Sequence, residues 1–124
     1  MLTKQQNTDK FGGTVISYQI TQGDTFPMLI SLRDDAGEVI PQSLINKVVF
    51  KLGDTDRRQV FTQEFVPTED GKYKLEVSGT ETALWEENTK YFYEVEATFT
   101  DTFNTTPLSY TSTIYVLPQI KPAE

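Results

Sequence analysis

The two carboxylates best spaced for acid/base chemistry in this sequence are Glu94 and Glu96. They stand two residues apart in an alternating segment, so an extended strand would project both from one face, about 7 Å apart at the backbone. A glycosidase needs two carboxyl groups at a comparable separation. The alternative is that both line the solvent face of a strand, and we favour it because Tyr93 and Val95 alternate with them.

Two residue types that carry much of enzyme chemistry are missing, because the chain has no histidine and no cysteine. Disulfides, thiolate nucleophiles and cysteine-ligated zinc are therefore excluded. The commonest general base is absent as well, so a serine nucleophile would have to rely on a lysine. No motif surrounds Lys47, Lys51 or Lys72. We expect a protein that is not an enzyme and that holds no cofactor.

The acidic segment Asp54-Thr55-Asp56 is the best candidate for a metal site. It could give two oxygen ligands to calcium, which takes about six to eight. Arg57 and Arg58 follow immediately and would repel a cation. We expect a charged hairpin tip here and no metal site.

Charge limits the partners that this chain can have. It carries 11 basic and 18 acidic residues, for a net charge of -7. A phosphate backbone or an anionic membrane surface would be repelled, so we expect neither nucleic acid nor membrane as a partner. No segment approaches the roughly 20 apolar residues of a membrane span, and the polar start at 1–6 does not resemble a signal peptide. The sequence indicates a soluble protein made in the cytosol.

Aromatic residues are the richer signal. Tyr91, Tyr93 and Phe99 recur with period two in one segment, which is more typical of a core-facing strand surface than of a sugar platform.

Four other aromatics are candidates for a protein interface. Phe61, Phe92 and Tyr115 fall on the opposite faces of their predicted strands, where exposed rings would mark a contact surface. Trp85 either caps the open end of the fold or anchors an interface, since tryptophan is enriched at binding hot spots.

Period-two alternation organises most of the chain. It predicts strands over 15–20, 25–33, 47–52, 60–66, 72–77, 90–100 and 108–117, with a brief pairing segment at 38–40. Pro27 lacks an amide proton, so its end of the second strand should lie at a sheet edge or a bulge. Residues 68–71 predict a hairpin turn. Ser78 and Glu81 have capping-box spacing and predict one short helix over 82–87.

These elements predict an all-β fold, an immunoglobulin-like two-sheet sandwich with one short helical crossover. A small barrel is the competing architecture, which periodicity does not separate from a sandwich. We expect a flexible N-terminal arm over 1–13, the sandwich domain over 14–118, and a C-terminal tail or tether over 119–124.

Several segments occur in a recognisable order. They are Gln22-Gly23-Asp24-Thr25-Phe26-Pro27, Leu32 to Ile40, Val48-Val49-Phe50-Lys51-Leu52, Asp70-Gly71-Lys72-Tyr73, Thr82-Ala83-Leu84, Tyr91 to Glu96, and Thr113-Ile114-Tyr115-Val116. Together they resemble the N-terminal immunoglobulin-like domain of upper baseplate proteins of tailed phages, and related small domains of phage structural proteins. The resemblance covers roughly residues 15 to 118.

This resemblance implies a virion structural role without catalytic residues. The protein would be made in the bacterial cytoplasm and would dock onto other tail or baseplate proteins in a symmetric assembly, as a homo-oligomer. A carbohydrate-binding or adhesin-type module stays open as the alternative, because of the aromatics and the acidic surface. An enzyme is a distant third, with Glu94 and Glu96 as its only worthwhile pair.

Overall fold

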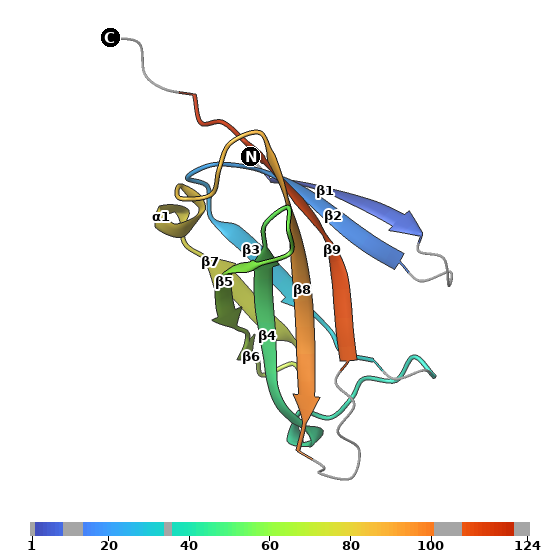
Figure 1. Cartoon of the computed structure of the whole chain (residues 1–124). Helices are drawn as coiled ribbons and strands as arrows, with labels where there is room; N and C mark the ends of the chain where they lie inside the picture. Colours follow the sequence, from blue (N-terminus) through green and yellow to red (C-terminus); the bar gives the residue numbers. More distant parts are fainter. Residues whose placement is uncertain (1, 9–13, 34–35, 101–107, 121–124) are drawn as a thin grey trace.

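A computed structural model of the chain describes residues 2–8, 14–33, 36–100 and 108–120, and the side chains among them except at 2–8, 14–15 and 108–110. Its strands form a six-stranded sheet in the order β1-β2-β9-β8-β4-β5 and a three-stranded sheet in the order β3-β7-β6 (Figure 1). The elements are β1 (Leu2–Thr8), β2 (Thr14–Thr21), β3 (Phe26–Ile30), η1 (Gln42–Leu44), β4 (Ile45–Gly53), β5 (Gln59–Glu64), β6 (Val66–Pro67), β7 (Tyr73–Val77), α1 (Gly79–Thr82), β8 (Thr89–Phe99) and β9 (Leu108–Leu117).

The strand order confirms the all-β two-sheet sandwich. The order β3-β7-β6 matches strands B-E-D of an immunoglobulin domain, and β9-β8-β4 matches strands G-F-C, with β5 added beside β4. Strand β2 runs parallel to β9, whereas the other strand pairs within the sheets are antiparallel. A closed barrel is wrong for this chain, because the strands separate into two sheets.

The core lies between the two sheets and follows the predicted alternation. In β7 and β8 every second side chain is buried and its neighbours face outward. The Phe50 and Tyr93 rings stack with centroids 5.9 Å apart, and Tyr18 meets Phe26 edge-on at 5.1 Å. These aromatic contacts join β2, β3, β4 and β8, so they tie the small sheet to the large one.

Pro27 lies where its missing amide predicts. Strand β3 pairs only with β7, and Pro27 stands opposite Glu76 at that edge. The outer side of β3 needs no donor from this residue, so the proline breaks no ladder hydrogen bond.

The single strand predicted over 60–66 is wrong, because the chain changes sheets there. Strand β5 belongs to the large sheet and β6 to the small one, and Phe65 is buried between them. The Phe65 amide donates to the carbonyl of Val48 at 2.8 Å. Side-chain alternation continues through this crossing, so the sequence pattern gives no sign that the backbone has changed partners.

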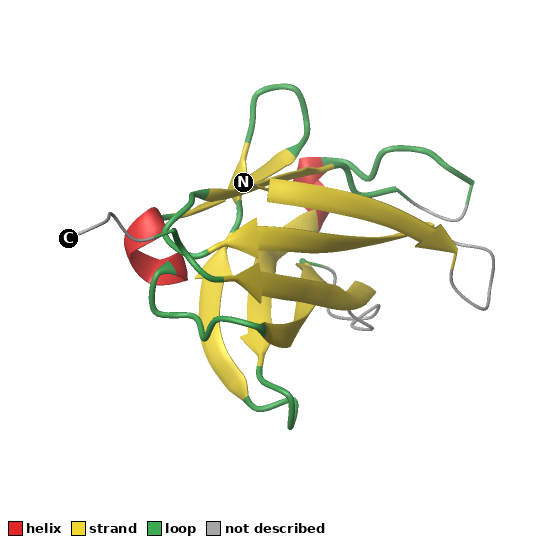
Figure 2. Cartoon of the chain, turned by 90° about the horizontal axis from the view of Figure 1, so that it is seen from above, coloured by secondary structure: helices red, strands yellow, loops and turns green. Residues whose placement is uncertain are grey.

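The predicted cap of the short helix is confirmed, but its predicted range over 82–87 is wrong, because the helix is Gly79–Thr82. Ser78 Oγ accepts a hydrogen bond from the Glu81 amide at 3.2 Å, and α1 covers only four residues instead of 82–87. The buried Thr82 hydroxyl donates to the Asp24 carbonyl at 2.7 Å and accepts from the Gly23 amide at 3.1 Å. These bonds tie the end of α1 to the β2–β3 turn, at the same end of the sandwich as the C-terminal segment (Figure 2).

Residue 79 must be glycine for this packing. A Cβ atom at Gly79 would lie 2.2 Å from the Gly23 carbonyl oxygen, which is far inside van der Waals contact. The backbone of α1 therefore approaches the β2–β3 turn more closely than a side chain allows.

The N-terminal arm expected over 1–13 is a strand for residues 2–8. Strand β1 pairs antiparallel with β2 along its whole length. Its sequence lacks an apolar period, but ladder hydrogen bonds use backbone groups that every residue except proline provides. Residues 9–13, and residues 121–124 of the expected tether, lie outside the described part of the chain.

Candidate interaction surfaces

Two of the four candidate interface aromatics point into the sandwich. Trp85 is only 4% exposed, and its ring meets those of Phe26, Phe61 and Tyr91. Phe61 pairs with Leu52 across β4 and β5 and packs against the core, so its expected outward orientation is wrong. Both residues therefore close the end of the core and offer little surface to a partner.

The other two candidates share the outer face of the large sheet. Phe92 pairs with Thr113 and Tyr115 pairs with Lys90, which makes the two aromatics diagonal neighbours on β8 and β9. Tyr115 is 38% exposed. The fold thus brings together two residues that lie far apart in sequence, on what we call the outer face.

The charged loop 54–58, which follows β4, lies over this face. The guanidinium carbon of Arg57 is 4.2 Å from the centroid of the Phe92 ring. Asp54 Oδ1 accepts from the amides of Asp56 at 2.9 Å and Arg58 at 3.0 Å, so this carboxylate closes the turn itself. Among the residues described, no group of three acidic side chains could hold a metal ion.

A lysine forms ion pairs with both of the glutamates that suggested acid/base chemistry. Lys51 Nζ on β4 lies 4.0 Å from Glu94 Oε1 and 3.5 Å from Glu96 Oε1. Both carboxylates leave the same face, as expected from their spacing, and both are partly exposed. The arrangement is a surface ion-pair cluster of a kind that contributes little to stability.

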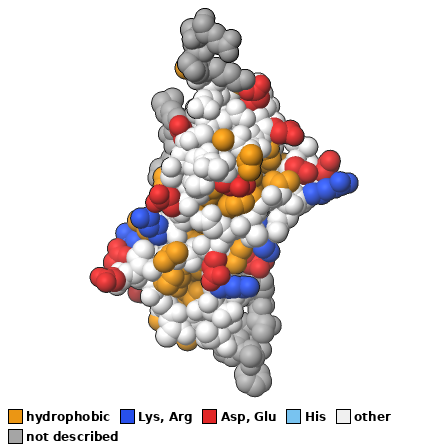
Figure 3. All heavy atoms as spheres, turned by 90° about the vertical axis from the view of Figure 1, so that its left-hand side faces the viewer, with side chains coloured by type: hydrophobic (Ala, Val, Ile, Leu, Met, Phe, Trp, Pro, Cys, Tyr) orange, Lys and Arg blue, Asp and Glu red, His pale blue; other side chains and the backbone are white. Residues whose placement is uncertain are grey.

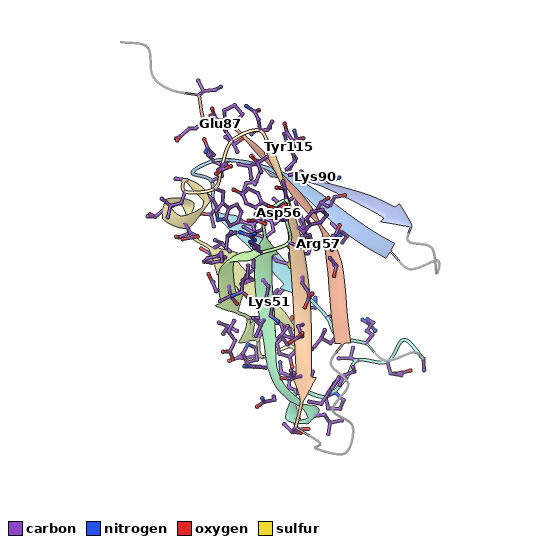
Figure 4. The ribbon with its side chains drawn as sticks, in the orientation of Figure 1. Lys51, Asp56, Arg57, Glu87, Lys90 and Tyr115 are labelled. Atoms are coloured by element: carbon purple, nitrogen blue, oxygen red, sulfur yellow. The ribbon has the colours of Figure 1, made fainter. Side chains whose placement is uncertain are left out.

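A shallow hollow of about 260 Å³ opens on the outer face between the loop and this cluster. Its walls come from β4, the following loop, β8 and β9, through Lys51, Leu52, Gly53, Arg57, Gln59, Phe92, Tyr93, Glu94 and Thr111. Figure 4 shows Lys51, Arg57, Lys90 and Tyr115 distributed along this face. Sequence reasoning missed Arg57, Gln59 and Thr111 as wall residues, because only the sheet register places them together.

The outer face of the small sheet is different in character. Leu29 and Val66 are 58% and 65% exposed, and both pair with Lys74 across β7. On the side of the molecule with α1, β5 and β7, hydrophobic side chains lie in separate groups between charged ones (Figure 3). Isolated exposed apolar residues of this kind are normal for a protein surface.

The four sheet edges differ in how well they are blocked. Strand β3 contains Pro27, and β6 has only two residues, of which the second is Pro67. Strand β5 is linked to the small sheet, because the side chain of its Gln63 donates a hydrogen bond to the Glu76 carbonyl of β7 at 3.0 Å. Strand β1 has seven residues, no proline and an unbroken register with β2. Among the described residues, it is the edge most open to a further strand.

Comparison with known proteins adds no relative to this picture. No protein-family model matches the sequence, and no curated protein matches it. Within the described residues, no helix is long and apolar enough to span a membrane. The class of the protein therefore rests on its own strand order, that of an immunoglobulin-like β-sandwich.

Proposed function

We propose that this chain is a non-catalytic structural protein of a tailed-phage virion, of tail or baseplate type. It docks onto other virion proteins in a symmetric assembly, after synthesis in the bacterial cytoplasm. The ordered motifs in the sequence and the two-sheet fold support this proposal. The observation that carries the docking step is the open edge of β1.

Strand β1 offers a row of backbone donors and acceptors to a neighbour. In an antiparallel ladder the amides of successive residues point to opposite sides, so about half of those in β1 face away from β2. Natural proteins usually block such an edge with proline, a bulge or a short strand. An edge of seven residues without these features suits sheet extension by another chain.

A second copy of the chain is the partner that β1 fits best. The strand carries one charged residue, Lys4, in a chain whose net charge is -7. If two copies pair antiparallel about Gln5, each Lys4 stands opposite Gln6 of the second copy, so like charges do not face each other. Such a contact has twofold symmetry, the commonest symmetry of soluble oligomers.

Sedimentation velocity and hydrogen exchange on the whole chain test this proposal. We expect a concentration-dependent dimer, in which alternate β1 amides that exchange quickly in dilute solution become protected. Replacing Gln5 and Gln6 with lysine should abolish both effects, because edge charges repel a second strand. The charge-matched control is Ser43→Lys with Thr80→Lys, at two exposed sites away from β1. A chain that stays monomeric and binds no virion protein encoded beside it would contradict the proposal.

A specific observation favours a second function, that of a carbohydrate-binding or adhesin-type module. The hollow on the outer face combines an arginine that lies over an aromatic ring with side chains that donate and accept hydrogen bonds. A glycan array on the purified chain tests this function, and saturable binding to one glycan class would support it.

A further inference from the structure

Arg57 has a backbone conformation that its side chain does not favour. Its φ is 61°, in the left-handed region where a Cβ atom crowds the backbone. The loop imposes this conformation, because the Arg57 amide donates to the Asp54 carbonyl at 2.9 Å while the Asp54 carboxylate accepts from two further amides. Unfavourable backbone geometry that persists in this way is concentrated at binding sites.

In this loop conformation the Arg57 guanidinium lies over an aromatic ring. The guanidinium carbon of Arg57 makes a cation–π contact with the Phe92 ring, and a guanidinium carries its N–H donors at the rim of its plane. No carboxylate lies within ion-pair distance of Arg57 among the described residues. By contrast, the nearby Lys51 is already paired with two glutamates. Arg57 is therefore the cation of the hollow that is available to an anion.

The rest of the hollow supplies groups of both hydrogen-bonding kinds. Gln59 can donate and accept, the Thr111 hydroxyl can do the same, and the Glu94 carboxylate accepts. Sugar hydroxyls need donors and acceptors close together, whereas a bare carboxylate brings no donor for Glu94. Together with Arg57, the hydrogen-bonding groups that line the hollow therefore favour a ligand that carries one carboxylate and several hydroxyls.

We propose that this hollow binds an acidic sugar unit, with the sugar carboxylate on the Arg57 guanidinium and its hydroxyls against Gln59, Glu94 and Thr111. Planar two-point recognition of carboxylates is what arginine does better than lysine. This inference goes beyond docking through β1 and names the ligand class for the second function above. Its test is separate from the oligomerisation test, so either can fail alone.

Nuclear magnetic resonance titration of the full chain with glucuronate tests the site. We expect saturable shifts confined to residues 51–59, 92–94 and 111, which weaken as salt is raised because the key contact is ionic. Glucose, which lacks the carboxylate, should give no comparable shifts. Equal binding of glucose, or no shifts with glucuronate, would overturn the proposal. If N-acetylglutamate produced the same shifts at the same concentrations, the site would be one for a bare carboxylate and the sugar assignment would be wrong.

Arg57→Gly separates the role of the side chain from that of the loop. Glycine accepts the left-handed backbone, so this variant should fold at least as well as the parent while losing the guanidinium. We expect glucuronate affinity to fall about 10-fold to 100-fold, the usual effect of losing hydrogen bonds to a charged group. Arg58→Gln removes the same charge from the neighbouring residue, which does not line the hollow, and should bind like the parent. Unchanged binding in Arg57→Gly, or an equal loss in Arg58→Gln, would refute the assignment.

Discussion

The amide of Glu86 donates a hydrogen bond to the phenolic oxygen of Tyr91 at 2.7 Å. Tyr91 lies near the start of β8, just after the crossover from β7, and its ring is buried against Trp85. Immunoglobulin-like sandwiches carry a tyrosine at this corner, bonded to the backbone a few residues upstream. This contact fixes the path by which the chain passes from the small sheet back to the large one.

Tyr91→Phe should destabilise the fold by about 1–2 kcal/mol, because it leaves the part-buried Glu86 amide without its acceptor. Urea unfolding of both proteins measures the difference. Tyr115→Phe removes the same hydroxyl from the outer face, where the ring is 38% exposed, and should change stability little. Equal losses in the two variants would show that the corner hydrogen bond has no special role.

Thr82→Val should cost about 1–3 kcal/mol, since it removes a fully buried hydroxyl that serves both the Asp24 carbonyl and the Gly23 amide. Valine has nearly the same shape, so the loss reports hydrogen bonding rather than packing. The matched control is Thr80→Val on the exposed side of α1. Thermal or urea unfolding should separate the two, and a neutral Thr82→Val would contradict the link between α1 and the β2–β3 turn.

The β6–β7 turn should lower the pKa of one carboxyl group, that of Asp70. The Thr68 hydroxyl donates to Asp70, and this bond lowers the pKa of that carboxyl below its ordinary value of 3.8. A lower pKa in the folded state gives stability that is present above pH 3.8 and lost as the pH falls through the folded-state pKa. A carbon-detected titration should show the lowered pKa, and Thr68→Val should return it toward 3.8. An unchanged titration in Thr68→Val would rule out this cause.

Alkaline pH should lower the stability of the fold, because Tyr73 and Tyr91 are buried. Burial raises the pKa of Tyr73 and of Tyr91 above the ordinary value of 10.0. The unfolded chain then loses these protons first, so the contribution of the two tyrosines to stability is fully present below pH 10 and is lost as the pH rises through the folded-state values. Urea midpoints measured from pH 8 to 11 should show this decline, with a smaller slope in Tyr73→Phe. Equal slopes in the variant and the parent would exclude Tyr73 as a source.

Local patterns predicted the strands well where one face is buried. The alternation in β7 and β8 told which side chains point inward, because successive residues of a strand face opposite ways. The missing amide of Pro27 likewise predicted a sheet edge. The same reasoning failed for β1, because its sequence has no apolar period although its backbone pairs with β2.

Alternation does not tell which side of a strand the core will occupy when both sides carry large residues. Val60 and Phe61 are both apolar, and the register with Leu52 turns Phe61 inward while Val60 is exposed. For a related reason the sequence left two roles open for Trp85, that of a cap on the core and that of an interface anchor. Its burial depends on Phe26 and Phe61, which come from strands far from it in the chain.

By itself the sequence determined the all-β class, the 68–71 turn and the lack of histidine and cysteine chemistry, since residue type and period two are local properties. Only the tertiary structure decided that Arg57 lies over Phe92, that Lys51 pairs with both Glu94 and Glu96, and that β1 is an edge strand among the described residues. Those relations depend on the register between strands far apart in the chain. Register is set by how the side chains of both sheets fill one core together, which no local segment encodes.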